Sequence, residues 1–203
     1  MLNAETPRLK FALYGAHSSL GNAVTCELLT RQHEVVALVD DLNSMTVRPG
    51  LRAKTGDLFD AVSVSQSVAG MDAVICLYES ASVPTASGAP ATAQRQDFYQ
   101  AVDALLSGLP KVGVERLLLV ADLSSHGEAP EVAAALQRIA VHPMKWTLVD
   151  AETDGEDLSL EDFADLEGLG DDDRRVQLRR IAAGMVDELE RPQHLHQQVH
   201  FRL

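Results

Sequence analysis

Basic residues, cysteines and long apolar runs are scarce in this sequence, and each shortage narrows the range of functions. The 203 residues hold 17 Lys and Arg against 30 Asp and Glu, which gives a net charge of −13. Nucleic acids and anionic membrane surfaces repel such a chain, so we expect neither as a partner. The two cysteines, Cys26 and Cys76, stand in contexts that favour neither a disulfide nor a metal site. We expect both to be reduced, buried thiols.

No apolar run is long enough to span a bilayer, and the N-terminal MLNAETPRLK lacks the apolar core of a signal peptide. The sequence therefore predicts a soluble, cytoplasmic protein. Its length fits a single domain over residues 1–203, with a small C-terminal region from about residue 151.

Residues 9–40 carry the strongest pattern in the chain. An apolar strand is predicted at 9–14, a glycine turn follows, and a second apolar strand is predicted at 34–39. The helix between them has an apolar face with a spacing of four residues, formed by Leu20, Val24 and Leu28. A strand that leads through a glycine turn into a helix is the usual cradle for a phosphate group.

This cradle predicts a set of cofactor-binding residues. The backbone N–H groups of the turn and of the first helical turn would face a pyrophosphate. Asp40 lies about 20 residues past the turn, where an acidic side chain can bind a ribose hydroxyl. The predicted turn residues are Gly15, Ala16, His17, Ser18, Ser19, Leu20 and Gly21.

The turn lacks the middle glycine of the usual three. Ser18 stands where a glycine would let the backbone approach the pyrophosphate. A serine costs space there but adds a hydroxyl donor. Two interpretations remain open: a dinucleotide cradle, or a degenerate turn that no longer binds anything.

The rest of the chain continues the alternation of strands and helices. This order predicts an α/β fold, a Rossmann-like doubly wound, mainly parallel sheet with helices on both faces. Further strands are predicted at 51–55, 72–78, 115–121, 145–150 and 197–203, and helices at 61–69, 91–106, 131–140 and 175–190.

Two clusters could suggest metal binding. Residues 151–173 are rich in Asp and Glu without a basic residue, but they show no calcium-loop spacing, and a solvated acidic loop is the alternative. His194, His196 and His200 have no carboxylate or cysteine spaced to complete a site, so we interpret them as structural. No metal is expected.

Several blocks in order resemble the atypical short-chain dehydrogenase/reductases, specifically the NmrA-like group and its NAD(P)H-flavin reductase-like relatives. The opening FALYGAHSSLGNAVTCELLTRQHEVVALV is similar to the family's strand, GATGxxG turn, helix and second strand. Later blocks resemble its GDxxD step, its GxDAVI strand, its GVKRLLVV strand, its DWTxV strand and its closing LDELExPxH. In this sequence these are residues 56–60, 70–75, 113–118, 146–149 and 186–194.

The resemblance implies further cofactor contacts. Asp57 and Leu58 fall in the step that lies near the adenine in the family. Tyr78 ends the fourth strand and would border the nicotinamide. Asp40 stands where the family often has an arginine for the 2′-phosphate, so NAD(H) is favoured over NADP(H).

The chemistry-bearing positions depart most from related dehydrogenases. The acid/base pair Tyr-xxx-Lys is absent, because Tyr99 is followed four residues later by Asp103. Ser124 and Ser125, after the fifth strand, are the catalytic candidates, as donors to a substrate carbonyl or flavin oxygen. The alternative for both is a turn or N-cap serine. His126 could act in acid/base chemistry or lie in an exposed loop.

The resemblance implies an NAD(P)H-dependent oxidoreductase that reduces a small acceptor, such as a flavin (FMN or FAD) or a quinone. Such a protein holds the nicotinamide beside the acceptor, and the cofactor supplies the hydride. The alternative is a catalytically inactive Rossmann-fold dinucleotide sensor that acts as a regulatory or binding protein. A sugar-nucleotide epimerase relative is a weaker third interpretation. The expected partner is a small-molecule dinucleotide, and a homodimer or a protein partner is left open.

Overall fold

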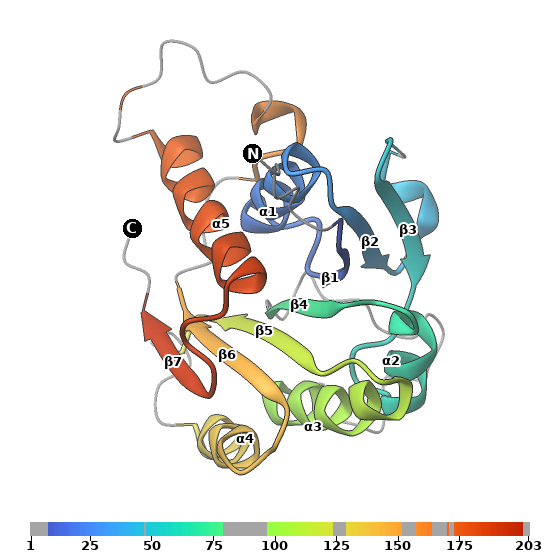
Figure 1. Ribbon diagram of the computed structural model, residues 1–203, viewed down its shortest axis with the longest axis vertical. Coiled ribbons are helices and arrows are strands. Elements are labelled where there is room, and N and C mark those ends of the chain that lie inside the picture. The colour runs from blue at the N-terminus through green and yellow to red at the C-terminus, as the bar shows by residue number, and fades with distance from the viewer. Residues whose placement is uncertain are drawn as a thin grey trace, which may run out of the picture.

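The computed structural model describes residues 8–46, 48–78, 97–123, 129–151, 157–163, 170 and 173–200. Within these residues seven strands form one sheet in the order β3-β2-β1-β4-β5-β6-β7 (Figure 1). Every neighbouring pair is parallel. The strands are β1 (Lys10–Tyr14), β2 (Glu34–Val39), β3 (Leu51–Thr55), β4 (Ala73–Tyr78), β5 (Arg116–Ala121), β6 (Lys145–Asp150) and β7 (Gln197–His200).

The helices form a layer on each face of this sheet (Figure 1). One layer holds α1 (Ser19–Thr30) and α5 (Arg174–Glu190), which pack on each other; the other holds α2 (Ala61–Val68), α3 (Phe98–Gly108) and α4 (Pro130–Ala140). Each layer closes its own apolar core against the sheet. The doubly wound, Rossmann-like α/β fold predicted from the sequence is therefore confirmed. Single-turn helices lie at Leu42–Ser44, Leu109–Val112 and Glu161–Phe163.

The direction of winding reverses beside β1, because the chain proceeds outward through β2 and β3 and then returns to pair β4 with β1. Ligands of open α/β sheets bind at the carboxyl ends of the strands at such a reversal. The glycine turn follows β1 directly, so the fold places it at that point.

Most predicted element boundaries agree with the structure. β2, β3 and β6 begin and end as predicted. The predicted start of the third helix at 91 lies outside the described residues, but Asp97 is extended, so an unbroken helix from 91 to 106 is wrong. The carboxylate of Asp97 accepts a hydrogen bond from the backbone N–H of Gln100 and caps the helix there, so α3 begins at Phe98.

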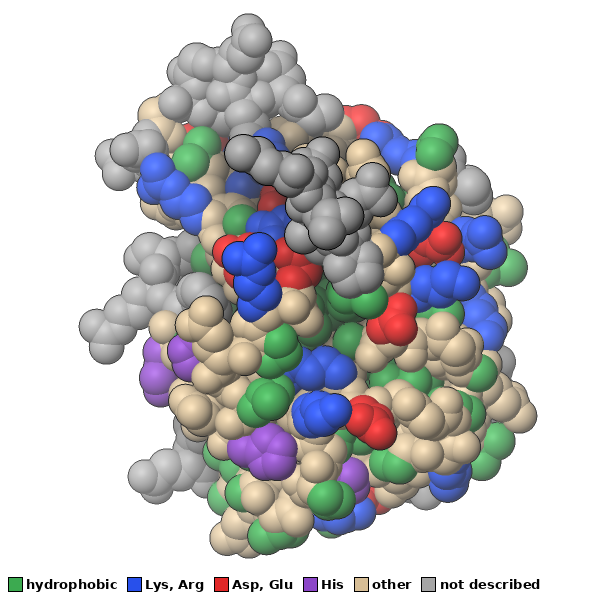
Figure 2. Space-filling view, viewed as in Figure 1, with side chains coloured by type: hydrophobic (Ala, Val, Ile, Leu, Met, Phe, Trp, Pro, Cys, Tyr) green, Lys and Arg blue, Asp and Glu red, His purple; other side chains and the backbone are tan. Residues whose placement is uncertain are grey.

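The two cysteines differ in burial. Cys76 is buried in β4 as expected, whereas Cys26 in α1 is only partly buried; neither is in a disulfide, and burial raises the pKa of the Cys76 thiol. No described helix is long and apolar enough to cross a membrane. The described residues hold no group of His, Cys, Asp or Glu that could bind a metal ion. On the face seen in Figure 2, acidic and basic side chains are interspersed.

Candidate functional site

The turn after β1 is packed so closely that two of its residues must be glycine. Gly15 has a φ of +78°, and a Cβ there would lie 2.4 Å from the carbonyl oxygen of Leu77. A Cβ on Gly21 would lie 2.2 Å from the carbonyl oxygen of Gly15. Real Cβ atoms essentially never come within 3.0 Å of such neighbours. The turn therefore retains the tight strand-to-helix geometry of a phosphate cradle.

Ser18, which replaces the middle glycine, turns its side chain into the turn. Its hydroxyl donates to the carbonyl oxygen of Gly15 at 2.9 Å and accepts from the backbone N–H of Gly21 at 3.0 Å. The side chain is buried and forms the N-cap of α1. The extra hydroxyl donor expected from the sequence is thus used within the turn, and the side chain does not project outward.

Ser18→Ala should lower the free energy of unfolding by about 1–2 kcal/mol, since it removes the N-cap of a buried helix end. Urea denaturation measures the change. Ser65→Ala is the matched control. Among the described contacts, the Ser65 hydroxyl donates only to the carbonyl oxygen of Val62 within α2, and this hydrogen bond is exposed. Equal stability of the two variants would contradict the capping role.

The other turn residues differ in burial and in their side-chain hydrogen bonds. Ala16 and Leu20 are buried, so only their backbone could face a ligand. His17 is exposed, and its Nε2 lies 2.9 Å from the hydroxyl of Ser44. The hydroxyl of Ser19 accepts a hydrogen bond from the backbone N–H of Leu158 at 2.9 Å.

The predicted adenine and ribose contacts come from neighbouring strand ends. Asp40 is exposed and follows β2, which lies beside β1 in the sheet. Asp57 follows β3, and its carboxylate accepts from the backbone N–H of Phe59 at 2.8 Å. Leu58 and Tyr78 are buried, and the ring of Tyr78 packs edge-on against Phe98.

The catalytic candidates Ser124, Ser125 and His126 lie outside the described residues. The end of β5 just before them is anchored by a contact that sequence reasoning missed. The carboxylate of Asp150 accepts from the backbone N–H of Leu123 at 3.0 Å, and its other oxygen lies 3.0 Å from Nδ1 of His200. The sequence feature that could have indicated this contact is an acidic residue, Asp150, at the end of a buried strand.

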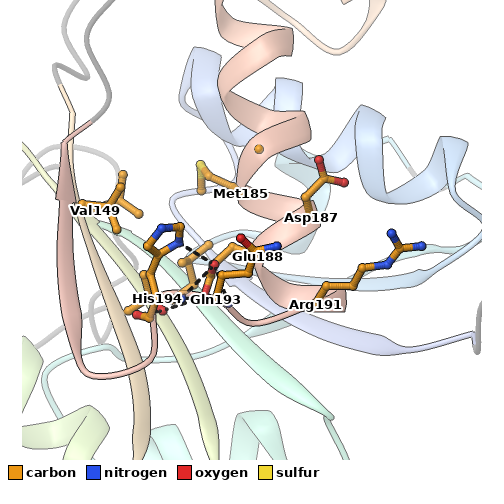
Figure 3. A pocket seen from close by; sticks show the side chains of 11 residues that line it. Val149, Met185, Asp187, Glu188, Arg191, Gln193 and His194 are labelled. Atoms are coloured by element: carbon orange, nitrogen blue, oxygen red, sulfur yellow. Dashed lines mark hydrogen bonds and ion pairs between the residues drawn. The ribbon is translucent and has the colours of Figure 1, made fainter.

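A cavity of about 370 Å³ lies between α5, β6 and β7 (Figure 3). Gln193 and His194 point toward Glu188 at its wall. The Glu188 carboxylate accepts from both backbone N–H groups and from the His194 ring, and it pairs with Arg116 at 3.1 Å. The lining residues include none of the predicted cofactor contacts. This arrangement fixes the end of α5 and the turn into β7.

Residues 15–159, well over half of the chain, match the model of a family described as NAD(P)H-binding. The chain belongs to this NAD(P)H-binding family. The match begins at Gly15, the first residue of the cradle, and it confirms the resemblance to the NmrA-like and flavin reductase-like proteins drawn from the sequence blocks. No curated protein sequence matches the chain.

Solved structures with the same fold cover almost the whole chain. A Rossmann-fold NAD(P)-binding family protein from Shigella flexneri is 12% identical with a TM-score of 0.66, covering 96% of this chain and 93% of that one. SP1627 from Streptococcus pneumoniae, a candidate NADH-flavin reductase, is 19% identical with a TM-score of 0.57, covering 95% and 98%. ChuY, an anaerobillin reductase from Escherichia coli O157:H7, is 17% identical with a TM-score of 0.62, covering 94% and 95%. At these identities the similarity establishes the fold.

Proposed function

We propose that this NAD(P)H-binding protein is an oxidoreductase that uses NADH to reduce a small acceptor such as a flavin or a quinone. The observation that carries the proposal is the intact cradle, in which Gly15 and Gly21 leave no room for a Cβ. The two glycines keep the strand-to-helix turn in the shape that presents backbone N–H groups to a pyrophosphate.

The residues present fit a dinucleotide. The buried, inward-turned side chain of Ser18 leaves the outer side of the turn to the pyrophosphate. Asp40 would accept a hydrogen bond from a ribose hydroxyl, and the backbone at Asp57 and Leu58 would border the adenine. Tyr78 would border the nicotinamide, because it ends β4 next to the turn.

When bound, the nicotinamide supplies the hydride. The protein has to hold the acceptor beside it and keep its orientation, which needs no fixed acid/base pair when the acceptor is a flavin. Ser124 or Ser125 would donate a hydrogen bond to the acceptor oxygen. Names of structural neighbours such as the NADH-flavin reductase candidate and the anaerobillin reductase support a reductase.

The test is the oxidation of NADH, followed by its absorbance, with FMN, FAD or a quinone added. The proposal expects turnover that depends on both the protein and the acceptor. Bound NADH that no acceptor oxidises would contradict it.

Asp40→Arg should shift cofactor preference toward NADPH. The carboxylate repels a 2′-phosphate, whereas a guanidinium pairs with it. We expect the ratio of the NADPH to the NADH dissociation constant to fall about tenfold or more, a change of at least about 1.4 kcal/mol. Fluorescence titration measures both constants. Asp72→Arg, just before β4 at the opposite edge of the sheet, is a charge-matched control, and an equal shift in that variant would contradict a role for Asp40.

The alternative function is a dinucleotide sensor that acts through a protein partner or a second copy. The observation that favours it is the docking of Leu158 on Ser19, within the first turn of α1, which links the cradle to a surface segment. Binding of NADH without oxidation of any acceptor would select this alternative. Either function would be carried out in the cytoplasm.

A further inference from the structure

A second cavity, of about 280 Å³, lies between α1, the connection from β2 to β3, and residues 157–161. Of the predicted cofactor contacts only His17 lines it, and no ligand has been assigned to the rest of its lining. We propose that this cavity binds a small phosphate monoester that carries hydroxyl groups, of the sugar phosphate class, with its phosphate on Arg48.

The cavity has a built wall. The backbone N–H of Leu158 donates to the hydroxyl of Ser19 at 2.9 Å, and the side-chain amide of Asn22 donates to the carbonyl oxygen of Leu158 at 2.9 Å. Phe163, just beyond, is buried in the core beside α1 and α5. Two hydrogen bonds and an apolar anchor therefore hold residues 157–163 against α1.

Arg48 provides the positive charge of the cavity. Its Nη2 donates to the carboxylate of Glu161, which is the one described hydrogen bond of this guanidinium. A guanidinium has five N–H donors in a planar fork that matches the oxygens of a phosphate. The Glu161 side chain is 65% exposed, so its carboxylate is accessible to displacement. We interpret Glu161 as an internal substitute for the oxyanion of the ligand.

Hydroxyl-bearing residues also line the cavity. They are Ser44, Thr46 and Ser159. Hydroxyls that both donate and accept suit the hydroxyls of a sugar.

Calorimetric titration with ribose 5-phosphate, in the absence of dinucleotide, tests the proposal. Ribose and inorganic phosphate serve as partial probes, and each should bind at least about tenfold more weakly than the intact monoester. The proposal would be overturned if millimolar ribose 5-phosphate gave no heat of binding. It would also be overturned if inorganic phosphate bound as tightly as ribose 5-phosphate.

Two substitutions with opposite expected effects on the affinity for ribose 5-phosphate test where its phosphate binds. Arg48→Gln should weaken binding at least about tenfold, since it removes a charge-assisted contact. Glu161→Gln should tighten binding, because it removes the carboxylate that competes for Arg48. Glu115→Gln is the control. It removes the same charge from the exposed ion pair with Lys145, just before β5, and should leave the affinity for ribose 5-phosphate almost unchanged.

A ligand bound at the glycine turn instead would respond equally to Glu161→Gln and Glu115→Gln. That result would contradict the site.

Discussion

Gly21→Ala should abolish NADH binding. The added Cβ would lie 2.2 Å from the carbonyl oxygen of Gly15 and 3.0 Å from Ala16, both backbone atoms that cannot rotate away. The turn would have to open, and the N–H groups proposed to bind the pyrophosphate would lose their common direction. We expect NADH affinity to fall by at least about a hundredfold, a loss of about 2.7 kcal/mol or more.

Two comparisons make this result specific. Thermal unfolding should show a folded protein destabilised by about 1–3 kcal/mol, the usual cost of overpacking a buried position. Gly170→Ala is the control, since a Cβ there has no described neighbour within 4 Å. A Gly21→Ala protein that binds NADH like the Gly170→Ala protein would show that the dinucleotide binds elsewhere.

Glu188→Ala should destabilise the fold by about 3–5 kcal/mol, because it leaves a buried cation without its counter-charge. The Arg116 side chain is 9% exposed and pairs with Glu188 at 3.1 Å. The same carboxylate also accepts from the backbone of Gln193 and His194, which start the turn into β7. Urea denaturation measures the loss. Glu115→Ala, whose carboxylate makes an exposed ion pair, is the control, and equal losses would contradict the role of Glu188.

The same contacts set the pH dependence of stability. Burial alone raises the pKa of Glu188, but the N–H donors of Gln193 and His194 and the charge of Arg116 outweigh it and hold the pKa below its ordinary 4.5. A carboxyl group with a lowered pKa stabilises the fold fully above pH 4.5, and this contribution is lost as the pH falls through the folded-state pKa. The difference in the free energy of unfolding between the wild-type protein and Glu188→Gln should therefore shrink as the pH falls below 4.5. A difference that persists or grows in acid would contradict this.

The local patterns of the sequence were sufficient for the fold and for the cradle. The strand, glycine turn and helix at residues 10–30 depend on neighbours within a few residues, and a buried strand such as β6 shows as an apolar run. The unbroken helix predicted from 91 was wrong because Thr92 and Asp97 can both cap a helix, and the sequence alone does not decide between them.

Contacts between distant segments could not be predicted. Ser19 and Leu158 are 139 residues apart, and Asp150 and His200 are 50 apart. Both pairs meet because parallel strands and their connecting loops return to the same sheet edge. The sequence indicated that Ser18 adds a hydroxyl donor to the turn, but not where it points; its position is set by the N-cap geometry of α1, in which the hydroxyl accepts from the N–H of Gly21.

The central claim is that the turn from Gly15 to Gly21 binds a dinucleotide and that Asp40 selects its form. Calorimetric titration of the wild-type protein with NADH and with NADPH tests it most directly. The expected result is binding of one NADH per chain, with NADPH weaker by about tenfold or more. Failure of both dinucleotides to bind at millimolar concentration would contradict the cradle, and tighter binding of NADPH would contradict the role of Asp40.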